Sequence, residues 1–274
     1  MKTIDSLPAH NLSDWVNSRD KLRVAAIGDS SVFGVGDSGG HLKSVGAGWA
    51  GRLAHDLACQ VFVNLAQNGA RARHLEKNQL PAAVAFDANL ALLCIGTNDI
   101  LRNDFSPQEI RSHLGNLAAE LTRNRCALVI LGLPNPIVSA PGPLMLRKIL
   151  SRRAEKVNAV LQEISKLPGV FYVDAWQSKM VQEKEFWHVD RMHPSPLGHQ
   201  KIANHIKQTL NLKQVSPVEK RIESPSSQFY KVFWLLTNGS KWFFKRSFDL
   251  LPAILWLLIG ELFRRMTRRK FMTE

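Results

Sequence analysis

The 274-residue sequence contains only three cysteines, Cys59, Cys94 and Cys126, which are far apart and form no Cys-x-x-Cys or Cys/His pattern. So few cysteines exclude a disulfide scaffold, and their spacing provides no zinc site. We therefore expect reduced thiols in a cytoplasmic protein. The first 20 residues also lack the continuous apolar stretch of a secretory signal peptide, because acidic residues and Pro8 interrupt them.

Acidic residues are scarce relative to basic ones. The chain has 23 Asp and Glu against 36 Lys and Arg, which gives a formal net charge of +13 and a pI of about 10.0. Such a charge favours an acidic partner, either nucleic acid or an anionic membrane surface. The 45% hydrophobic and 22% charged residues are ordinary for a globular protein and exclude a disordered or collagen-like chain.

The positive charge is concentrated near the C-terminus, where residues 213–274 hold 12 basic and 5 acidic residues. Residues 213–228 combine prolines, serines and alternating charges without apolar periodicity, which is typical of an exposed linker. The sequence therefore predicts a main domain in residues 1–212, with its core at about 20–210, a linker at 213–228, and a separate apolar and basic segment at 229–274.

Long hydrophobic runs are also lacking, even in this last segment. Its longest uncharged run, residues 250–260, would extend about 16 Å as a helix, roughly half the thickness of the bilayer hydrocarbon. We expect an anchor at the membrane interface, bound to anionic lipid on the cytoplasmic side, rather than a membrane span. The alternative is that the segment packs on the main domain or forms an oligomer interface. Nucleic acid is not expected as a partner, because no recognition motif accompanies the charge.

Short β-rich runs alternate with helical patterns through the main domain. The expected strands cover residues 22–28, 61–66, 90–96, 127–133 and 169–175. The helical patterns include residues 106–121, 143–166 and 195–210, and the first of these opens with Ser106 as N-cap and Pro107 at the first helical position. This alternation predicts an α/β fold with a five-stranded parallel sheet covered by helices on both faces. Ligands bind at the carboxyl ends of the strands in such sheets.

Polar motifs follow four of these runs. They are Gly28-Asp29-Ser30-Ser31 after the first, Asn68-Gly69 after the second, Gly96-Thr97-Asn98-Asp99 after the third, and Asp190-Arg191-Met192-His193 after the fifth. Any one of them alone is ordinary turn chemistry. Together, at strand ends that meet at one edge of a sheet, they predict a hydrolytic site.

The residue types suit nucleophilic catalysis. Ser30 supplies a hydroxyl that His193 can activate as a neutral base, and Asp190, three residues earlier, can orient the imidazole. The candidate donors to a developing oxyanion are the backbone N–H of Ser30, the backbone N–H of Gly69 and the side-chain amide of Asn98. Glycine allows close approach of its backbone to a substrate oxygen, and an amide donates without adding charge.

With these motifs in this order, the sequence resembles the SGNH hydrolases, also called the GDSL lipase/esterase superfamily, over about residues 20–210. Two positions depart from the usual pattern: Ser31 replaces a leucine, and the third motif reads Gly-Thr-Asn-Asp. The resemblance implies a flavodoxin-like three-layer α/β/α fold with strand order 2-1-3-4-5. It also implies ester hydrolysis through an acyl-serine, with no metal or other cofactor.

Neighbouring residues leave alternatives open. Asp29 and Asp99 are interpreted as turn-capping residues, and Asp190 is preferred to Asp174 as the partner of His193 because of the Asp-x-x-His spacing. His199, like the nearby His188, is interpreted as a packing or capping residue rather than a catalytic one.

Arg71 and Arg73 fit a solvated face better than a site for a substrate phosphate or carboxylate. The glycine-rich stretch 34–48 is expected to be a mobile loop beside the nucleophile.

The sequence thus predicts a cytoplasmic, membrane-associated serine esterase that acts on an acyl ester, with a lipid as the first candidate. A soluble acyl-thioesterase or small-ester esterase with a structural tail is the second hypothesis. An inactive, membrane-bound binding module is the third.

Overall fold

The computed structural model describes residues 7–8, 11–37 and 48–214, together with Pro252, Leu255, Trp256 and 258–260. Its centre is a five-stranded sheet in the order β2-β1-β3-β4-β5. The strands are β1 (Arg23–Gly28), β2 (Val61–Asn64), β3 (Leu90–Cys94), β4 (Ala127–Leu131) and β5 (Val170–Val173). All four strand pairs are parallel. The predicted α/β fold and strand order are confirmed.

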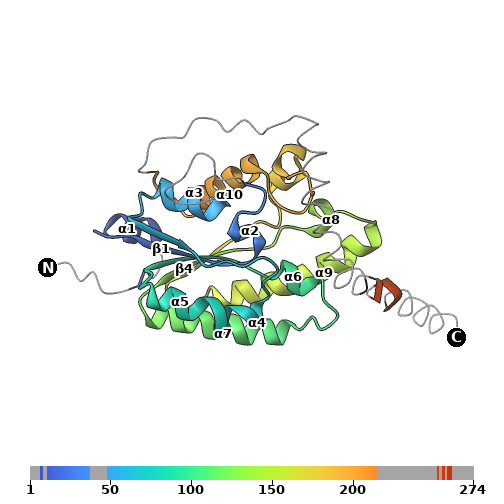
Figure 1. Cartoon of the computed structure of the whole chain (residues 1–274), viewed down its shortest axis with the longest axis horizontal. Helices are drawn as coiled ribbons and strands as arrows, with labels where there is room; N and C mark the ends of the chain where they lie inside the picture. Colours follow the sequence, from blue (N-terminus) through green and yellow to red (C-terminus); the bar gives the residue numbers. More distant parts are fainter. Residues whose placement is uncertain are drawn as a thin grey trace.

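Helices cover both faces of the sheet (Figure 1), with α3 and α10 on one side and α4, α5, α7 and α9 on the other. The α-helices are α1 (Leu12–Asn17), α2 (Ser30–Phe33), α3 (Gly48–Asp56), α4 (Ala72–His74), α5 (Leu80–Ala85), α6 (Thr97–Ile100), α7 (Pro107–Arg123), α8 (Pro136–Ser139), α9 (Leu144–Ile164) and α10 (Pro196–Thr209). A π-helical turn, η1 (Leu75–Gln79), and two 3₁₀ turns, η2 (Lys179–Gln182) and η3 (Lys184–Phe186), complete the elements of the described domain.

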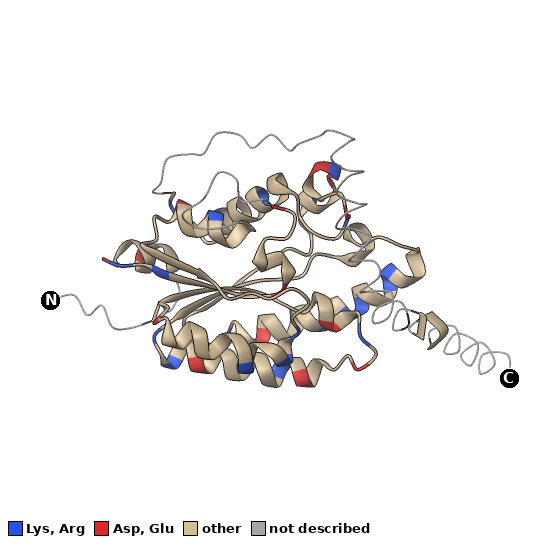
Figure 2. Cartoon of the chain, viewed as in Figure 1, with Lys and Arg blue, Asp and Glu red and all other residues tan. Residues whose placement is uncertain are grey.

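The central strands are apolar because both of their faces are covered. Every residue of β3 and β4 is buried, and so is β1 from Val24 onward. Figure 2 shows the same separation, with charged residues on helices and loops and almost none in the middle of the sheet. Burial of these Val, Leu and Ile side chains is the main stabilising contribution, at about 1.5–3 kcal/mol for each large side chain.

Two of the long helices, α7 and α10, begin directly after a serine that caps their N-terminus. The Ser106 side chain accepts a hydrogen bond from the backbone N–H of Glu109 at 3.2 Å, and Pro107 opens α7 as predicted. Ser195 caps α10 in the same way, accepting from the N–H of Gly198 at 3.1 Å. Each cap satisfies a donor that the first helical turn leaves unpaired.

The C-terminal segment is described at only a few positions, so the predicted linker from residue 215 onward and most of the predicted anchor lie outside the described residues. Leu258 packs against the core, whereas Leu255 and Trp256 are 58% and 65% exposed. Within the part of the chain that is described, no helix is both long enough and apolar enough to span a bilayer.

Candidate active site

The turn after β1 presents Ser30 at the carboxyl edge of the sheet. Gly28 has φ +145°, and a Cβ there would lie 2.2 Å from the carbonyl oxygen of Cys94, so the turn requires glycine. The backbone N–H of Asp29 donates to that same carbonyl at 3.3 Å. The Asp29 side chain, which is buried, accepts from the N–H and the hydroxyl of Ser31, both at 2.9 Å. Asp29 therefore caps α2, as interpreted from the sequence, and Ser30 is the first residue of that helix.

Three side chains, one from the turn after β1 and two from the loop before α10, form a continuous hydrogen-bonded line. The Oγ of Ser30 lies 2.8 Å from Nε2 of His193, and Nδ1 of His193 lies 2.8 Å from Oδ2 of Asp190. Because a carboxylate can only accept, Nδ1 carries the proton and Nε2 is left to accept from the serine hydroxyl. Ser30 and His193 are only partly buried, so a ligand can reach them.

Asp190 is held as a carboxylate by its surroundings. Its Oδ1 accepts from the backbone N–H of Met192 at 2.9 Å and of His193 at 3.0 Å. Nδ1 of His188 lies 3.6 Å from Oδ2, a second imidazole contact that sequence reasoning missed. Partial burial acts to raise the pKa of Asp190, but the neighbouring imidazoles and backbone donors together lower it well below its ordinary value.

Asp174, the alternative partner considered for His193, makes a different contact. Oδ1 of Asp174 accepts from the backbone N–H of Trp176 at 2.8 Å, which makes it a turn cap after β5. The choice of Asp190 as the aspartate beside His193 therefore agrees with the geometry. Among the described residues, no cluster of His, Cys, Asp or Glu is arranged to hold a metal ion.

Hydrogen bonds connect the segment that follows β2 with the segment that follows β3. The amide Nδ2 of Asn98 donates to the carbonyl oxygen of Ala70 at 3.0 Å, directly beside Gly69, which has φ +79°. Oδ2 of the buried Asp99 accepts from the N–H of Ala72 at 3.2 Å. Burial raises the pKa of Asp99, against the lowering effect of the Ala72 N–H. Asp99 is therefore a tether between the two segments, as interpreted from the sequence.

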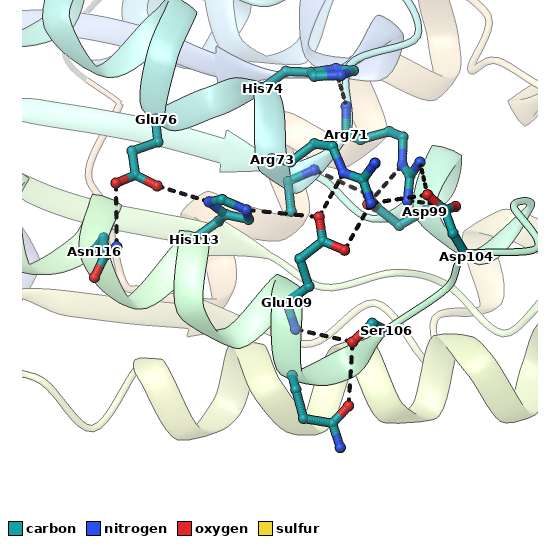
Figure 3. Close-up of polar contacts among 12 residues, drawn as sticks. Arg71, Arg73, His74, Glu76, Asp99, Asp104, Ser106, Glu109, His113 and Asn116 are labelled. Atoms are coloured by element: carbon teal, nitrogen blue, oxygen red, sulfur yellow. Dashed lines mark hydrogen bonds and ion pairs between the residues drawn. The ribbon is translucent and has the colours of Figure 1, made fainter.

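The sequence-based interpretation as a solvated face is wrong for Arg71, whereas the Arg73 side chain is 35% exposed (Figure 3). The Arg71 side chain is only 11% exposed and pairs with Asp99 at 3.3 Å and with Asp104 at 3.0 Å. Arg73 pairs with Asp104 at 3.0 Å and with Glu109 at 2.6 Å. Both guanidinium groups thus have carboxylate partners within the domain. These ion pairs connect the segment after Gly69 to the start of α7, so they do not favour a role for either arginine in binding a substrate anion.

Buried polar residues fix both ends of the glycine-rich stretch. Asp37 is paired with the buried Arg52 at 2.8 Å and also accepts from the N–H of Gly48 at 3.1 Å. His199 is buried, accepts from the N–H of Trp49 at 3.1 Å and lies 3.1 Å from the carbonyl oxygen of Val35. Burial lowers the pKa of His199 to about 4, so it is a neutral packing residue. Residues 38–47, which the mobile-loop expectation mainly concerns, lie outside the described residues.

An apolar cavity of about 330 Å³ opens beside the Ser30–His193 pair. Its lining includes the sequence neighbours of these two residues, Ser31, Met192 and Pro194. The rest is almost entirely aliphatic and aromatic, with Leu131, Leu133, Leu146, Leu150, Met180, Phe186 and Trp187 among the larger side chains. The volume falls in the range of small-molecule sites. Sequence reasoning did not foresee this cavity, because its walls come from elements that are distant in the sequence, among them α3, β3, α6, β4, α8, α9, η2, η3 and α10.

Comparison with known proteins identifies the family. The model of the GDSL-like Lipase/Acylhydrolase family matches residues 26–201, more than half of the chain. The chain belongs to this family, and it is an ester hydrolase of the SGNH type. A comparison with curated proteins finds no significant match.

Solved structures share the fold at low sequence identity. TesA is 18% identical, with a TM-score of 0.52, covering 69% of this chain and 98% of its own. Axe2, an acetylxylan esterase from Geobacillus stearothermophilus, is 19% identical, with a TM-score of 0.52 and coverage of 72% and 97%. LAE5, an alpha/beta hydrolase enzyme from the metagenome of Lake Arreo, Spain, is 20% identical, with a TM-score of 0.52 and coverage of 69% and 95%. Variants of Axe2 described as catalytic mutants replace a serine, an aspartate and a histidine.

Proposed function

We propose that this ester hydrolase cleaves acyl esters through a covalent acyl-serine, with Ser30 as nucleophile, His193 as general base and acid, and Asp190 as the residue that orients the imidazole. The observation that carries the proposal is the Ser30–His193–Asp190 line, with both hydrogen bonds at 2.8 Å. The same three residue types are replaced in the catalytic mutants of Axe2.

The chemistry follows from this geometry. Nε2 of His193 takes the hydroxyl proton while Oγ of Ser30 forms a bond to the acyl carbonyl carbon. The tetrahedral intermediate collapses, and the leaving alcohol receives the proton from Nε2. A water molecule then gives a proton to Nε2 and attacks the acyl-serine, which releases the carboxylic acid and restores Ser30. Asp190 stabilises the imidazolium that forms twice in this cycle.

The oxyanion of each tetrahedral intermediate needs donors that are already in place. We assign this role to the backbone N–H groups of Ser30 and Gly69 and to the amide of Asn98. The hydrogen bond from Asn98 to Ala70 and the Asp99 tether support the assignment, because they link the segments that carry Gly69 and Asn98. Donors fixed before the reaction need no reorganisation when the negative charge develops.

The apolar cavity favours an ester with a hydrophobic acyl chain, such as a lipid. Because burial of each methylene contributes about 0.8 kcal/mol, kcat/KM should rise about fourfold per added methylene until the cavity is full. The same cavity suits the acyl group of a thioester, so oxygen esters and thioesters of one chain length should be compared directly. An inactive binding module is disfavoured, because nothing separates the Ser30 hydroxyl from its base.

We further propose that residues 229–274 hold the enzyme on an anionic membrane surface on the cytoplasmic side. Support comes from the exposed Leu255 and Trp256 and from the basic residues of the segment. Exposed aromatic and aliphatic side chains with neighbouring lysines and arginines are typical of interfacial anchors. The unpaired state of Cys59, Cys94 and Cys126 fits a reducing compartment.

The function is tested by Ser30→Ala in the full chain. We expect loss of labelling by a fluorophosphonate probe and a fall in ester hydrolysis of about 10⁴-fold or more, with an unchanged circular dichroism spectrum. Ser31→Ala is the matched control: its hydroxyl donates to Asp29, whereas it is the Ser30 hydroxyl that meets His193, so labelling should remain. If Ser31→Ala abolishes labelling and Ser30→Ala does not, the nucleophile is wrongly assigned.

A further inference from the structure

Among the residues that the structure describes, Arg191 is the only charged one that lines the apolar cavity. It lies in the catalytic loop, directly after Asp190 and two residues before His193. Its side chain is exposed to solvent, so a ligand in the cavity can reach it. A single cation beside an otherwise apolar wall, close to the reacting groups, is the usual pattern for a polar contact that orients a ligand.

The backbone of Arg191 is unusual for its residue type. Its φ is +57°, in the left-handed region that favours glycine, and its N–H donates to the carbonyl oxygen of His188 at 2.9 Å. Glycine would make this turn without steric cost. Four other non-glycine residues of the described ranges also have a positive φ, and Arg191 is the one among the five that lines the cavity. The turn keeps the Arg191 side chain at the cavity.

No acidic side chain of the described residues neutralises Arg191. The nearest carboxylate in sequence, Asp190, accepts from Nδ1 of His193 and from the backbone of the catalytic loop. Arg71, Arg73 and Arg52, by contrast, all have carboxylate partners. Arg191 thus differs from these arginines in offering its guanidinium to a ligand.

We propose that Arg191 binds a phosphate group on the alcohol part of the substrate, so that the preferred substrate is a monoacyl ester of a phosphorylated alcohol. The inference rests on the proposed function, since it assumes that the acyl chain lies in the cavity and the ester at Ser30. Arg191 lines the cavity but is also exposed to solvent, so its guanidinium can reach the part of the ester that extends out of the cavity, which is the alcohol. A guanidinium matches phosphate with two parallel hydrogen bonds, whereas an ammonium makes a single-point contact.

The test compares two soluble substrates with the same acyl chain, 1-octanoylglycerol 3-phosphate and 1-octanoylglycerol, with the full-length enzyme. The measured quantity is the ratio of kcat/KM for the phosphate ester to kcat/KM for the neutral ester. We expect Arg191→Gly to lower this ratio about 10- to 100-fold, as for loss of a charge-assisted hydrogen-bond pair. Arg191→Lys should recover part of it, and added salt should lower the wild-type ratio.

Arg125→Gly is the matched control. Arg125 is also exposed, also has a left-handed φ of +58°, and lies in the turn before β4, at the opposite end of the strands from Ser30. The substitution therefore makes the same change in net charge and in backbone preference without touching the cavity, and it should leave the ratio unchanged.

Two results separate the proposals. If the wild type prefers the neutral ester, or if Arg191→Gly and Arg125→Gly change the ratio alike, the phosphate inference is overturned while the hydrolase function stands. If neither substrate, nor esters of other chain lengths, is cleaved by a serine-dependent reaction, the proposed function itself fails.

Discussion

Asp190 holds His193 at two points. One carboxylate oxygen accepts from Nδ1 of the ring at 2.8 Å, and the other accepts from the backbone N–H of the same residue at 3.0 Å. The two bonds fix the position of the imidazole, its tautomer and the direction of Nε2 toward Ser30. An Asp-x-x-His spacing permits both because the loop turns back within three residues.

Asp190→Asn should lower kcat about 10⁴-fold, because an amide no longer enforces the tautomer in which Nε2 accepts the serine proton. Asp174→Asn is the control: that residue caps a turn away from His193, and its substitution should leave kcat within a few-fold of the wild type. Steady-state hydrolysis of a short-chain ester measures both. Equal losses would show that Asp190 has no special role.

The fall of kcat/KM at low pH should follow the ionisation of a single group. Because the pKa of Asp190 lies well below its ordinary value, the carboxylate stays ionised through the acid limb of the pH profile. Only the neutral imidazole is a base, so log kcat/KM should fall with a slope of one as the pH is lowered. A slope of two would mean that Asp190 titrates together with the histidine.

Asn98→Ala should lower kcat about 10²- to 10³-fold with a smaller change in KM, the usual result of removing one oxyanion donor. The substitution also removes the hydrogen bond to Ala70, so the melting temperature must be measured in parallel. Undiminished turnover in a folded Asn98→Ala enzyme would exclude the assigned role.

His199 should make the fold less stable in acid. Burial lowers its pKa from 6.5 to about 4 in the folded protein, so the unfolded chain binds more protons between these values. Stability is therefore full above pH 6.5 and decreases as the pH falls toward 4. Linkage gives a loss of about 2 kcal/mol in the free energy of unfolding between pH 7.5 and 5.

His199→Gln is the informative variant, because glutamine can also accept from Trp49 and donate to Val35 but does not titrate. Urea unfolding at the two pH values measures the effect as the difference between wild type and variant. An identical pH dependence in the two proteins would show that His199 does not contribute.

The C-terminal segment should carry membrane binding. Truncation after Ser226 should leave short-chain ester hydrolysis intact and abolish sedimentation with anionic vesicles, whereas the full chain is only partly released by high salt because apolar contacts are not screened. In the full chain, Trp256→Glu should weaken vesicle binding. Equal binding by the truncated protein, or loss of its activity, would show that the segment belongs to the catalytic domain.

Much of this enzyme could be predicted from the order of residues alone. Buried parallel strands leave continuous apolar runs, and helix caps leave Ser-Pro signals at Ser106 and Ser195, so the parallel sheet and the long helices were predictable from the residues. The strand order was implied by the family resemblance that the strand-end motifs carry. The four strand-end motifs placed Ser30, Gly69, Asn98 and His193 at one edge, because parallel strands all end on the same side.

Tertiary structure decided what depends on contacts between distant segments. No sequence pattern indicated that Arg71 and Arg73 pair with Asp99, Asp104 and Glu109, because ion pairs depend on which loops meet in space. The cavity beside Ser30 had no motif either, since its apolar walls come from many elements that are distant in the sequence and each wall residue alone looks like ordinary core. The position of Arg191 at that cavity follows from a left-handed turn, which only the folded backbone specifies.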